Sequence, residues 1–435
     1  MNAQVSFLDG TLSLIHIPLD LYPNLLQPIL KVLLPPSQDP SQSAAEGLTI
    51  ESHSHGFLNI SVTPIECSIV CNSAWAESVF APAIRRLSGD EAKTVAISKD
   101  TYAALSVYGT GMDAGSRVAD LTSPLALANI PIFFITTYYS DFILVPTKDQ
   151  QAVVQTLLGK GFVFSEDDQS RLVSSTNPSP TATSHHHHGH GFGIGHNKTP
   201  SQTGSTLSYP SPPPPSSVDD LQQRTFDLLK KRNVVPHVDP TLTLVQCTGT
   251  RIHNQPPFSA RSHHHHHNSN NHSNSNSSPH SKPNWIDTID TRLYTSLVTA
   301  LASQPRFLSF TLAHDDPPSL LLDRALLGLF GASLLGPIEE GDDGAGALVP
   351  IFLDLADLPF EAAGIVSGVA GRLVREMGMG MGTGTGAVQQ GQGQGQGQGE
   401  LSYLSTARAG AVILPREQAG LALGVLGPLL GPGVE

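Results

Sequence analysis

Two hydrophobic patterns recur along the chain: short apolar runs typical of strands, and longer segments with apolar residues every three to four positions. Residues 12–17 (LSLIHI) fit the first pattern, and residues 21–34 fit the second, with Leu25, Ile29 and Leu33 on one helical face. The runs FLNISV and CSIVC then predict a hairpin, and WAESVFAPAIRRL predicts a second helix. The predicted order is strand, helix, strand, strand, helix.

Part of this order occurs twice later in the chain. Residues 135–158 align without gaps on residues 404–427, at a constant offset of 269. In each stretch a strand carries a threonine, a short polar turn follows, and an apolar strand ends at a proline before an apolar helix. Proline suits a helix start, because the N–H that it lacks has no helical partner there. The chain therefore contains a duplicated hairpin and helix.

Strand-like runs and glycine-opened helical segments precede both hairpins. The runs are YAALSVYG and ALVPIFLDL, and the helical segments begin at Gly115 and Gly364. The segments TLTLVQC, IDTIDTRLYTSLVTALA, RFLSFTLA and SLLLD repeat the order found near the N-terminus. We therefore predict an α+β fold of four βαββα(β) units in two tandem pairs, each an antiparallel sheet with helices on one face.

Low-complexity tracts separate and interrupt these units. They hold almost no branched or aromatic apolar residues, so they cannot offset the entropy of ordering their backbone, and we expect disorder. The predicted division is units at residues 12–88, 89–168, 218–345 and 346–430, a Ser/Pro/His linker at 169–217, and inserts at 254–284 and 377–400.

Histidines are concentrated in the tracts. Of the 19 histidines, 13 lie there, including the runs at residues 185–188 and 263–267. Clustered imidazoles bind Zn²⁺ or Ni²⁺, but these lack fixed spacing and supporting groups. We predict no physiological metal site and no cofactor.

The charge balance and the motifs restrict the function. The chain has 24 Lys+Arg against 37 Asp+Glu, a formal net charge of −13. Because phosphate binding needs clustered Lys and Arg, nucleic acid and anionic membranes are excluded as main partners. The motifs G-x-S-x-G, H-E-x-x-H and C-x-x-C do not occur, and we predict that the protein is not an enzyme.

The three cysteines favour a reducing compartment. Cys67 and Cys71 lie on one predicted strand, roughly 13 Å apart, which is too far for a disulfide. Together with Cys247, they are expected to be buried thiols. The N-terminus lacks the basic region of a signal peptide, and charged residues break the most apolar stretches. We predict a cytoplasmic protein without a membrane span.

Three segments resemble a known family: LSLIHIPLDLYPNLLQPILKVLLP, IPIFFITTYYSDFILVPTKDQQAVVQTL and LADLPFEAAGIVSGVAGRL. They are similar to the tandem ACT-domain proteins of the CASTOR type, cytosolic arginine sensors upstream of the TORC1 growth pathway. The strongest marks are the T-x-x-x-D-F-x-L-V hairpin and the F-E-x-x-G-I-V turn. The resemblance implies ACT-like (ferredoxin-like βαββαβ) units, with a free amino acid bound between the second and the fourth.

The resemblance also implies a ligand site. In such sensors, a strand of the second unit and a glycine turn of the fourth bind the α-amino and α-carboxylate groups through backbone atoms, and an Asp faces the arginine guanidinium. Carried across, the strand positions are Ile130, Pro131 and Ile132, the turn comprises Ala362, Ala363, Gly364, Ile365 and Val366, and the Asp position falls on Gly410.

Two of these positions depart from the family pattern. Pro131 has neither N–H nor hydroxyl to donate, and Gly410 supplies no carboxylate. Losing one charge-assisted hydrogen bond costs about 1.5–3 kcal/mol. One alternative is a pseudo-symmetric site built from Gly115, Ser116 and Asp141 with residues 401–406. Another is a neutral or aliphatic amino acid in the first site.

The leading hypothesis is a non-catalytic regulatory protein that senses a free amino acid, forms a homodimer through its ACT sheets, and feeds nutrient signalling to TORC1. The alternative is a ligand-free ACT-domain interaction scaffold, whose low-complexity tracts recruit partners. A packed interface without a pocket between the second and fourth units would favour the scaffold.

Overall fold

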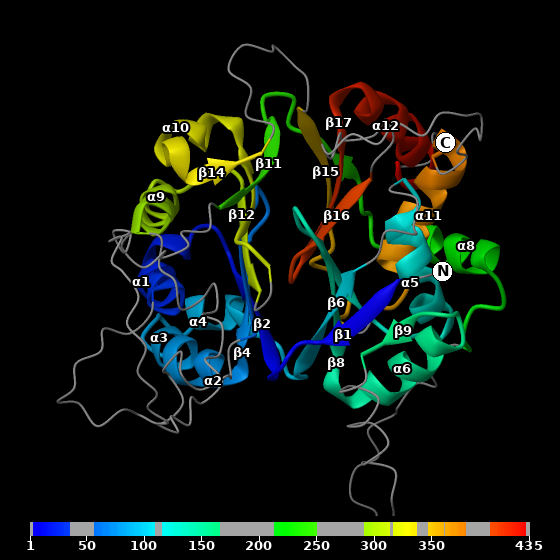
Figure 1. Cartoon of the computed structure of the whole chain (residues 1–435), viewed down its shortest axis with the longest axis horizontal. Helices are drawn as coiled ribbons and strands as arrows, with labels where there is room; N and C mark the ends of the chain where they lie inside the picture. The colour runs from blue at the N-terminus through cyan, green and yellow to red at the C-terminus, as the bar shows by residue number, and fades with distance from the viewer. Residues whose placement is uncertain are drawn as a thin grey trace, which may run out of the picture.

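The strands close into one β-barrel with helices on its outside, as the computed structural model in Figure 1 shows. The structure describes residues 3–34, 56–108, 115–165, 213–249, 291–313, 316–336, 347–360, 362–379 and 401–431. The predicted insert at 254–284, the predicted linker up to residue 212 and the second insert from residue 380 onward lie outside the described residues.

The first half of the chain contains the strand and the helix predicted from residues 12–34, and one further strand, which was not predicted, precedes them. Its elements are β1 (Gln4–Phe7), β2 (Leu12–Ile17), α1 (Tyr22–Leu33), β3 (Phe57–Val62), β4 (Cys67–Asn72), the successive helical turns α2 (Ser73–Trp75), η1 (Ala76–Phe80) and α3 (Ala81–Ile84), then α4 (Glu91–Thr94), β5 (Ala96–Ile97), β6 (Tyr102–Tyr108), α5 (Arg117–Leu127), β7 (Phe133–Thr136), β8 (Asp141–Pro146), η2 (Thr147–Asp149), α6 (Gln150–Leu158) and β9 (Val163–Phe164).

The second half opens with a helix that the sequence patterns did not single out. Its elements are α8 (Val218–Lys231), β10 (Pro236–His237), β11 (Leu244–Gly249), α9 (Thr291–Ala302), β12 (Leu308–Ala313), β13 (Ser319–Asp323), η4 (Arg324–Leu326), α10 (Leu327–Phe330), η5 (Gly331–Ser333), β14 (Leu334–Leu335), β15 (Leu348–Asp354), α11 (Ile365–Met377), β16 (Ser402–Ser405), β17 (Ala409–Pro415) and α12 (Arg416–Leu430).

Local sequence explains where the helices α8 and α11 begin. Ser217 caps α8, because its side chain accepts the N–H of Asp220 at 3.1 Å, and Asp219 adds negative charge to the first turn. Helix α11 begins after Gly364, whose φ of +88° lies in the left-handed region that favours glycine. Both starts are therefore fixed by single residues.

The barrel wall is one continuous antiparallel ring. Its order is β6–β8–β7–β16–β17–β15–β11–β13–β12–β3–β4–β2 and back to β6. The remaining strands, β1, β5, β9, β10 and β14, pair with members of this ring or with one another at its rim.

The predicted fold class, four separate ferredoxin-like ACT-like units in two tandem pairs, is therefore wrong. The strands and helices within each predicted unit form in the expected order, but the sheets do not remain separate. Strands of different predicted units pair with one another: β3 with β12, and β7 with β16. An open edge leaves backbone N–H and C=O groups without partners, and closing the barrel removes those edges.

Two junctions join strands that are far apart in the sequence. At the first junction, β3 and β12 pair over six positions, from Val62–Leu308 to Phe57–Ala313. At the second junction, β7 and β16 share one residue pair, Ile135 with Leu404. Side chains complete the second junction: the Phe134 N–H donates to Ser405 Oγ at 2.9 Å, and the Tyr403 N–H donates to Thr136 Oγ1 at 3.0 Å.

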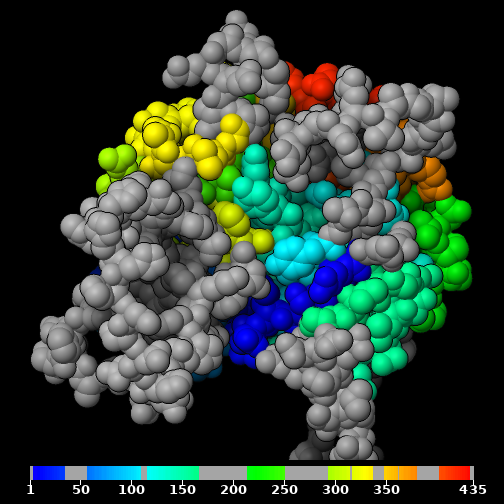
Figure 2. Space-filling model, in the orientation of Figure 1, coloured from blue at the N-terminus to red at the C-terminus, as the bar shows by residue number. Residues whose placement is uncertain are grey.

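Both faces of the barrel wall are apolar. Along β8, Phe142 and Leu144 belong to the core inside the barrel, whereas Ile143 and Val145 pack under the helices. The helices form two layers on opposite sides of the strands, with α1 and α9 in one layer and α5, α8 and α11 in the other (Figure 1). Figure 2 shows the N-terminal residues as a band lying against the residues around β9, with which β1 pairs.

The three cysteines are free and buried, as the sequence predicted. Burial raises the pKa of the Cys71 and Cys247 thiols to about 12, and it also raises that of Cys67. Among the described residues, no helix is long and apolar enough to cross a membrane. The same residues contain no group of three or more His, Cys, Asp and Glu side chains placed to hold a metal ion.

Candidate functional site

The turn between β16 and β17 is a compact hydrogen-bonded structure at one end of the barrel. The Thr406 N–H donates to the Ala409 carbonyl at 2.8 Å, and the Ala409 N–H donates back to Thr406 Oγ1 at 3.1 Å. The Thr406 hydroxyl lies 3.1 Å from the Ala409 carbonyl, so it has an acceptor within the turn as well as outside it, whereas the Arg408 N–H donates outside the turn. We call residues 406–409 the C-terminal turn.

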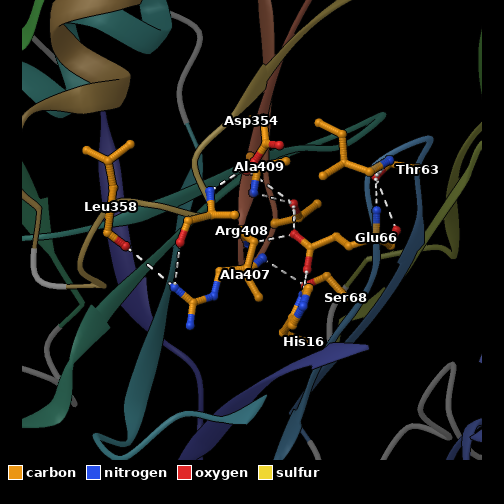
Figure 3. Close-up of polar contacts among 12 residues, drawn as sticks. His16, Thr63, Glu66, Ser68, Asp354, Leu358, Ala407, Arg408 and Ala409 are labelled. Atoms are coloured by element: carbon orange, nitrogen blue, oxygen red, sulfur yellow. Dashed lines mark hydrogen bonds and ion pairs between the residues drawn. The ribbon is translucent and has the colours of Figure 1, made fainter. Parts of the chain in front are cut away.

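Glu66, from the loop between β3 and β4, supplies that acceptor (Figure 3). Its Oε1 accepts the Thr406 hydroxyl and the Arg408 N–H, each at 2.6 Å. Its Oε2 lies 2.5 Å from His16 Nδ1 on β2. The Glu66 residue is fully buried, at 0% exposure. A buried carboxylate is stable only when it is well hydrogen-bonded, and these contacts meet that requirement.

Two further contacts hold the C-terminal turn in place. The Ala407 N–H donates to Ser68 Oγ at 3.0 Å. The Arg408 guanidinium lies 4.3 Å from the centre of the Phe360 ring and donates to the carbonyls of Ala356, at 3.2 Å, and Leu358. The turn therefore ties the N-terminal hairpin to the segment between β15 and α11.

A second turn, between β7 and β8, has the same internal bonds. The Thr137 N–H donates to the Ser140 carbonyl at 2.9 Å, and the Ser140 N–H donates to Thr137 Oγ1 at 3.2 Å. The Tyr138 N–H donates to Ser319 Oγ on β13 at 2.9 Å, just as Ala407 donates to Ser68. We call residues 137–140 the central turn. No carboxylate contact to it equivalent to that of Glu66 occurs among the described residues.

The residues of the expected ligand site, Gly410 excepted, belong to two segments that pack in the core cluster under α5, α8 and α11. Ile130, Pro131 and Ile132 directly precede β7, and Ile130 packs in the same core cluster as Ile365 and Val366. Ala362 and Ala363 are half-buried. Gly364 is covered by α8: a side chain there would approach the Leu221 methyl group to 2.6 Å, and Thr225 Oγ1 donates to the Gly364 carbonyl at 3.2 Å.

Gly410, the expected position of the ligand-binding Asp, lies on β17 against Tyr403. A Cβ at Gly410 would come within 2.5 Å of the Tyr403 hydroxyl, so no carboxylate fits there without displacing that ring. The Tyr403 hydroxyl is buried and has no hydrogen-bond partner among the described groups, and burial raises its pKa. The glycine at this position is thus explained by packing.

The alternative site contains an ion pair within the chain. Asp141 Oδ2 lies 2.5 Å from Arg117 Nε, and Asp141 is only 3% exposed. Its neighbour in the proposal, Ser116, donates its hydroxyl to Asp120 Oδ2 at 2.7 Å. Gly115 is buried at the start of α5. The carboxylate expected to meet a ligand guanidinium therefore already holds a guanidinium of the protein.

A groove runs beside these residues, between α5 and α11 and under the start of α8. Its volume is about 720 Å³. Leu127, Phe162 and Met379 contribute apolar surface. The polar lining consists of Ser116, Asp120, Ser123, Lys160, Asp219, Gln222 and Arg375. Ser116, one residue of the alternative site, therefore lines a groove that is formed by both halves of the chain.

Small residues let the helices around the groove approach closely. Ser123 of α5 and Ser367 of α11 share a hydrogen bond of 3.0 Å. A Cβ on Gly371 would lie 2.9 Å from Gln222 Nε2. Gln222 is 4% exposed, and its Oε1 has no hydrogen-bond partner among the described groups. Asp219 pairs with Arg375, which leaves Asp120 and Lys160 as the charges without an ion-pair partner in the described lining.

Sequence reasoning did not identify Glu66, His16, Lys160 or Gln222. Glu66 was overlooked because it stands at the start of an apolar strand run, IECSIVC. A single acidic residue directly before such a run is the available signal, because burying its carboxylate costs free energy unless hydrogen-bond donors bind it.

One comparison with known proteins identifies a domain type. Residues 97–158, which extend from the end of β5 through α6, match the family model described as an ACT domain. ACT domains bind amino acids and often oligomerise, so this match indicates a regulatory amino-acid-binding role in general. No curated protein matches the chain.

Two solved structures are similar to parts of the chain. Protein Atu0741 from Agobacterium tumefaciens is 19% identical over 44% of this chain and 99% of its own, with a TM-score of 0.24. The aspartate kinase from Synechocystis is 10% identical over 99% of this chain, with a TM-score of 0.27. This chain spans 57% of that kinase. At these values, neither similarity supports an argument about function.

Proposed function

We propose that this protein is a non-catalytic regulator that binds a free amino acid in the groove between α5 and α11. The observation that carries the proposal is that helix α5 of the ACT-matching segment forms one wall of a groove, and that α8 and α11 of the C-terminal half form the wall opposite. A volume near 720 Å³ lies within the range of about 300–1,000 Å³ typical of small-ligand sites.

The charges of the groove suit a zwitterion. Asp120 can accept the α-ammonium group, and Lys160 can bind the α-carboxylate. Because Asp219 and Arg375 neutralise each other, the lining carries no net charge. Leu127, Phe162 and Met379 then surround an apolar side chain. A neutral amino acid therefore fits this lining better than arginine does.

The action that follows from such a site is regulatory. A ligand that contacts both α5 and α11 stabilises the arrangement in which these helices are docked. The stabilisation equals the difference between the ligand's binding free energies for the docked and undocked arrangements. Three free, buried cysteines support a cytoplasmic location. The resemblance to the CASTOR type extends the proposal to a homodimer that feeds nutrient signalling to TORC1.

Thermal-shift and calorimetric titration of the full chain against the twenty amino acids tests this function. We expect stabilisation by neutral amino acids, and in Lys160→Met a loss of about fivefold in affinity, the value of one partly exposed ion pair near 1 kcal/mol. Lys93→Met, which changes an exposed lysine of α4, is the matched control. If no amino acid stabilises the protein at millimolar concentration, the ligand-free scaffold is the better description.

A further inference from the structure

The loop between α3 and α4, residues 85–90, presents two arginines and a serine to solvent. Arg85, Arg86 and Ser88 are all exposed. Neither arginine takes part in an ion pair within the described part of the chain. Two adjacent cations without an acidic partner are available to carboxylates of another molecule, which can bind each guanidinium group through two hydrogen bonds.

The spacing of these residues is that of a phosphorylation site. Ser88 follows the first arginine by three positions and the second by two. Many protein kinases select arginines at these distances before the acceptor, because carboxylates of the kinase pair with them. Adjacent basic residues occur at one other place in the sequence, Lys230 to Arg232, and no serine or threonine follows within eight residues. The sequence therefore offers this arrangement once.

The structure distinguishes Ser88 from other hydroxyls at a similar spacing. In the described residues, an arginine stands three positions before a serine or threonine at three places: Ser88, Thr295 and Ser309. Thr295 lies inside helix α9, and Ser309 is 5% exposed on β12 in the barrel wall. Of the three, Ser88 lies outside helices and strands and is exposed. A surface loop is the kind of segment that another protein can bind in an extended form.

The loop can open without disturbing the barrel. Within the described residues, every hydrogen bond of residues 85–94 joins residues at most four positions apart. Leu87 is half-buried and packs against the core cluster, whereas the residues around it are exposed. Segments with few buried contacts and local hydrogen bonds open at a small cost in free energy. Opening residues 85–94 therefore leaves the pairing of the strands intact.

We propose that Ser88 accepts a phosphoryl group from ATP, transferred by a serine/threonine protein kinase that selects arginine. Ser88 Oγ forms a bond to the γ-phosphorus, and the bond from that phosphorus to the oxygen shared with the β-phosphate breaks, so that ADP leaves. The hydroxyl proton passes to a catalytic aspartate of the kinase. This modification does not depend on ligand binding in the groove between α5 and α11.

The phosphate changes the bonds at the start of α4. In the unmodified chain the Ser88 N–H donates to Glu91 Oε2 at 3.1 Å, and the Glu91 N–H donates to Ser88 Oγ at 3.4 Å. A phosphoserine carries a charge of about −1.5 to −2, so it repels the Glu91 carboxylate and attracts the guanidinium groups of Arg85 and Arg86. The bond from Ser88 to the Glu91 side chain is then lost, directly before β5 and the ACT-matching segment.

Incubation of the full chain with ATP and the catalytic subunit of cyclic-AMP-dependent protein kinase, an arginine-selecting enzyme, tests the proposal. Peptide mass spectrometry is expected to find a phosphoryl group on Ser88. Ser309 is the internal control, because it stands at the same distance from Arg306 but is buried in the folded chain. An unmodified Ser88, or equal rates at Ser88 and Ser309, overturns the proposal.

Two double variants test the role of the arginines. Arg85→Gln with Arg86→Gln is expected to lower kcat/KM for Ser88 by about tenfold or more, because charge-assisted contacts to the kinase are lost. Lys230→Gln with Lys231→Gln, which removes the same charge from the other basic run, is expected to leave kcat/KM unchanged. Equal losses in both would show that net charge, and not this pair, determines the rate, which contradicts the proposal.

Protein purified from the organism that makes it provides the second measurement. The peptide that contains Ser88 is expected to carry phosphate in part of the molecules, and a phosphatase is expected to remove it. Absence of this phosphate from growing and starved cells alike overturns the proposal, even where the kinase modifies Ser88 in the tube.

Discussion

The two junctions of the barrel are closed in different ways. At the first junction, β3 and β12 pair along six residues, and Asn59 adds a buried network, accepting the Ser61 hydroxyl at 2.8 Å and donating to Thr311 Oγ1 at 3.0 Å. At the second junction, β7 and β16 share one residue pair, and the hydroxyls of Thr136 and Ser405 accept the neighbouring N–H groups.

This difference assigns different roles to the two sides of the molecule. A backbone ladder does not depend on particular side chains, so we expect the first junction to be the harder of the two to open. The second junction depends on two hydroxyls, and it lies on the side of the ACT-matching segment and the groove. The regulatory role proposed above needs an interface that can change at moderate cost, and the second junction is the better candidate because it has fewer backbone pairs.

Removing Glu66 should have the largest effect, because this residue connects the two junctions. It lies on the loop after β3 and binds the turn after β16. Glu66→Leu leaves His16, the Thr406 hydroxyl and the Arg408 N–H without their buried acceptor. We expect a loss of about 3–5 kcal/mol in the free energy of unfolding, measured by urea denaturation.

Glu66→Gln is the matched control for that substitution. It keeps the shape and one acceptor oxygen, so it should cost less than Glu66→Leu. Equal losses in both variants would show that packing, and not the hydrogen bonds of the carboxylate, holds the two junctions together.

The elements were predictable because their signals are local. The apolar runs at residues 57–62 and 67–71 give β3 and β4, and the aligned stretches around Thr137 and Thr406 give the two turns with equivalent bonds. Barrel closure was not predictable, because it depends on pairs such as Ile60 with Phe310, which are separated by 250 residues. The sequence pattern of an apolar strand is the same whether the strand stays at an open sheet edge or pairs with another strand.

The candidate site was only partly predictable for a similar reason. Ser116 was identified and lines the groove, whereas Lys160 and Gln222 lie in separate segments that only folding brings together. Asp141 was identified as a carboxylate that binds a ligand, but it forms an ion pair with Arg117, the residue after Ser116. Sequence spacing does not show which internal cation occupies a carboxylate.

Asn59→Ala tests whether the first junction also relies on side chains. The substitution leaves the hydroxyls of Ser61 and Thr311 without their buried partner, and we expect a loss of about 1–3 kcal/mol. The cysteine thiols pack in the same core cluster as the strands of this junction. Labelling by a thiol reagent should therefore become faster in Asn59→Ala. An unchanged labelling rate would show that the ladder alone keeps this layer closed.

Thr136→Val and Ser405→Ala test the second junction. Each removes the acceptor of one buried N–H, of Tyr403 or of Phe134, and we expect about 1–2 kcal/mol from each. Hydrogen exchange of these two amides should accelerate, while thiol labelling in the opposite layer stays at the wild-type rate. Faster thiol labelling in either variant would show that the two junctions open together.

Tyr403→Phe should have the smallest effect, and in the opposite direction. The Tyr403 hydroxyl is buried beside Gly410 without a hydrogen-bond partner among the described groups, so its removal ends a desolvation cost while the ring still fills its place. We expect a gain of up to about 1 kcal/mol in the free energy of unfolding. A loss of stability would mean that the hydroxyl has an acceptor when the protein is in solution. The second junction would then depend on three side-chain hydroxyls, and its contrast with the backbone ladder of the first junction would be greater still.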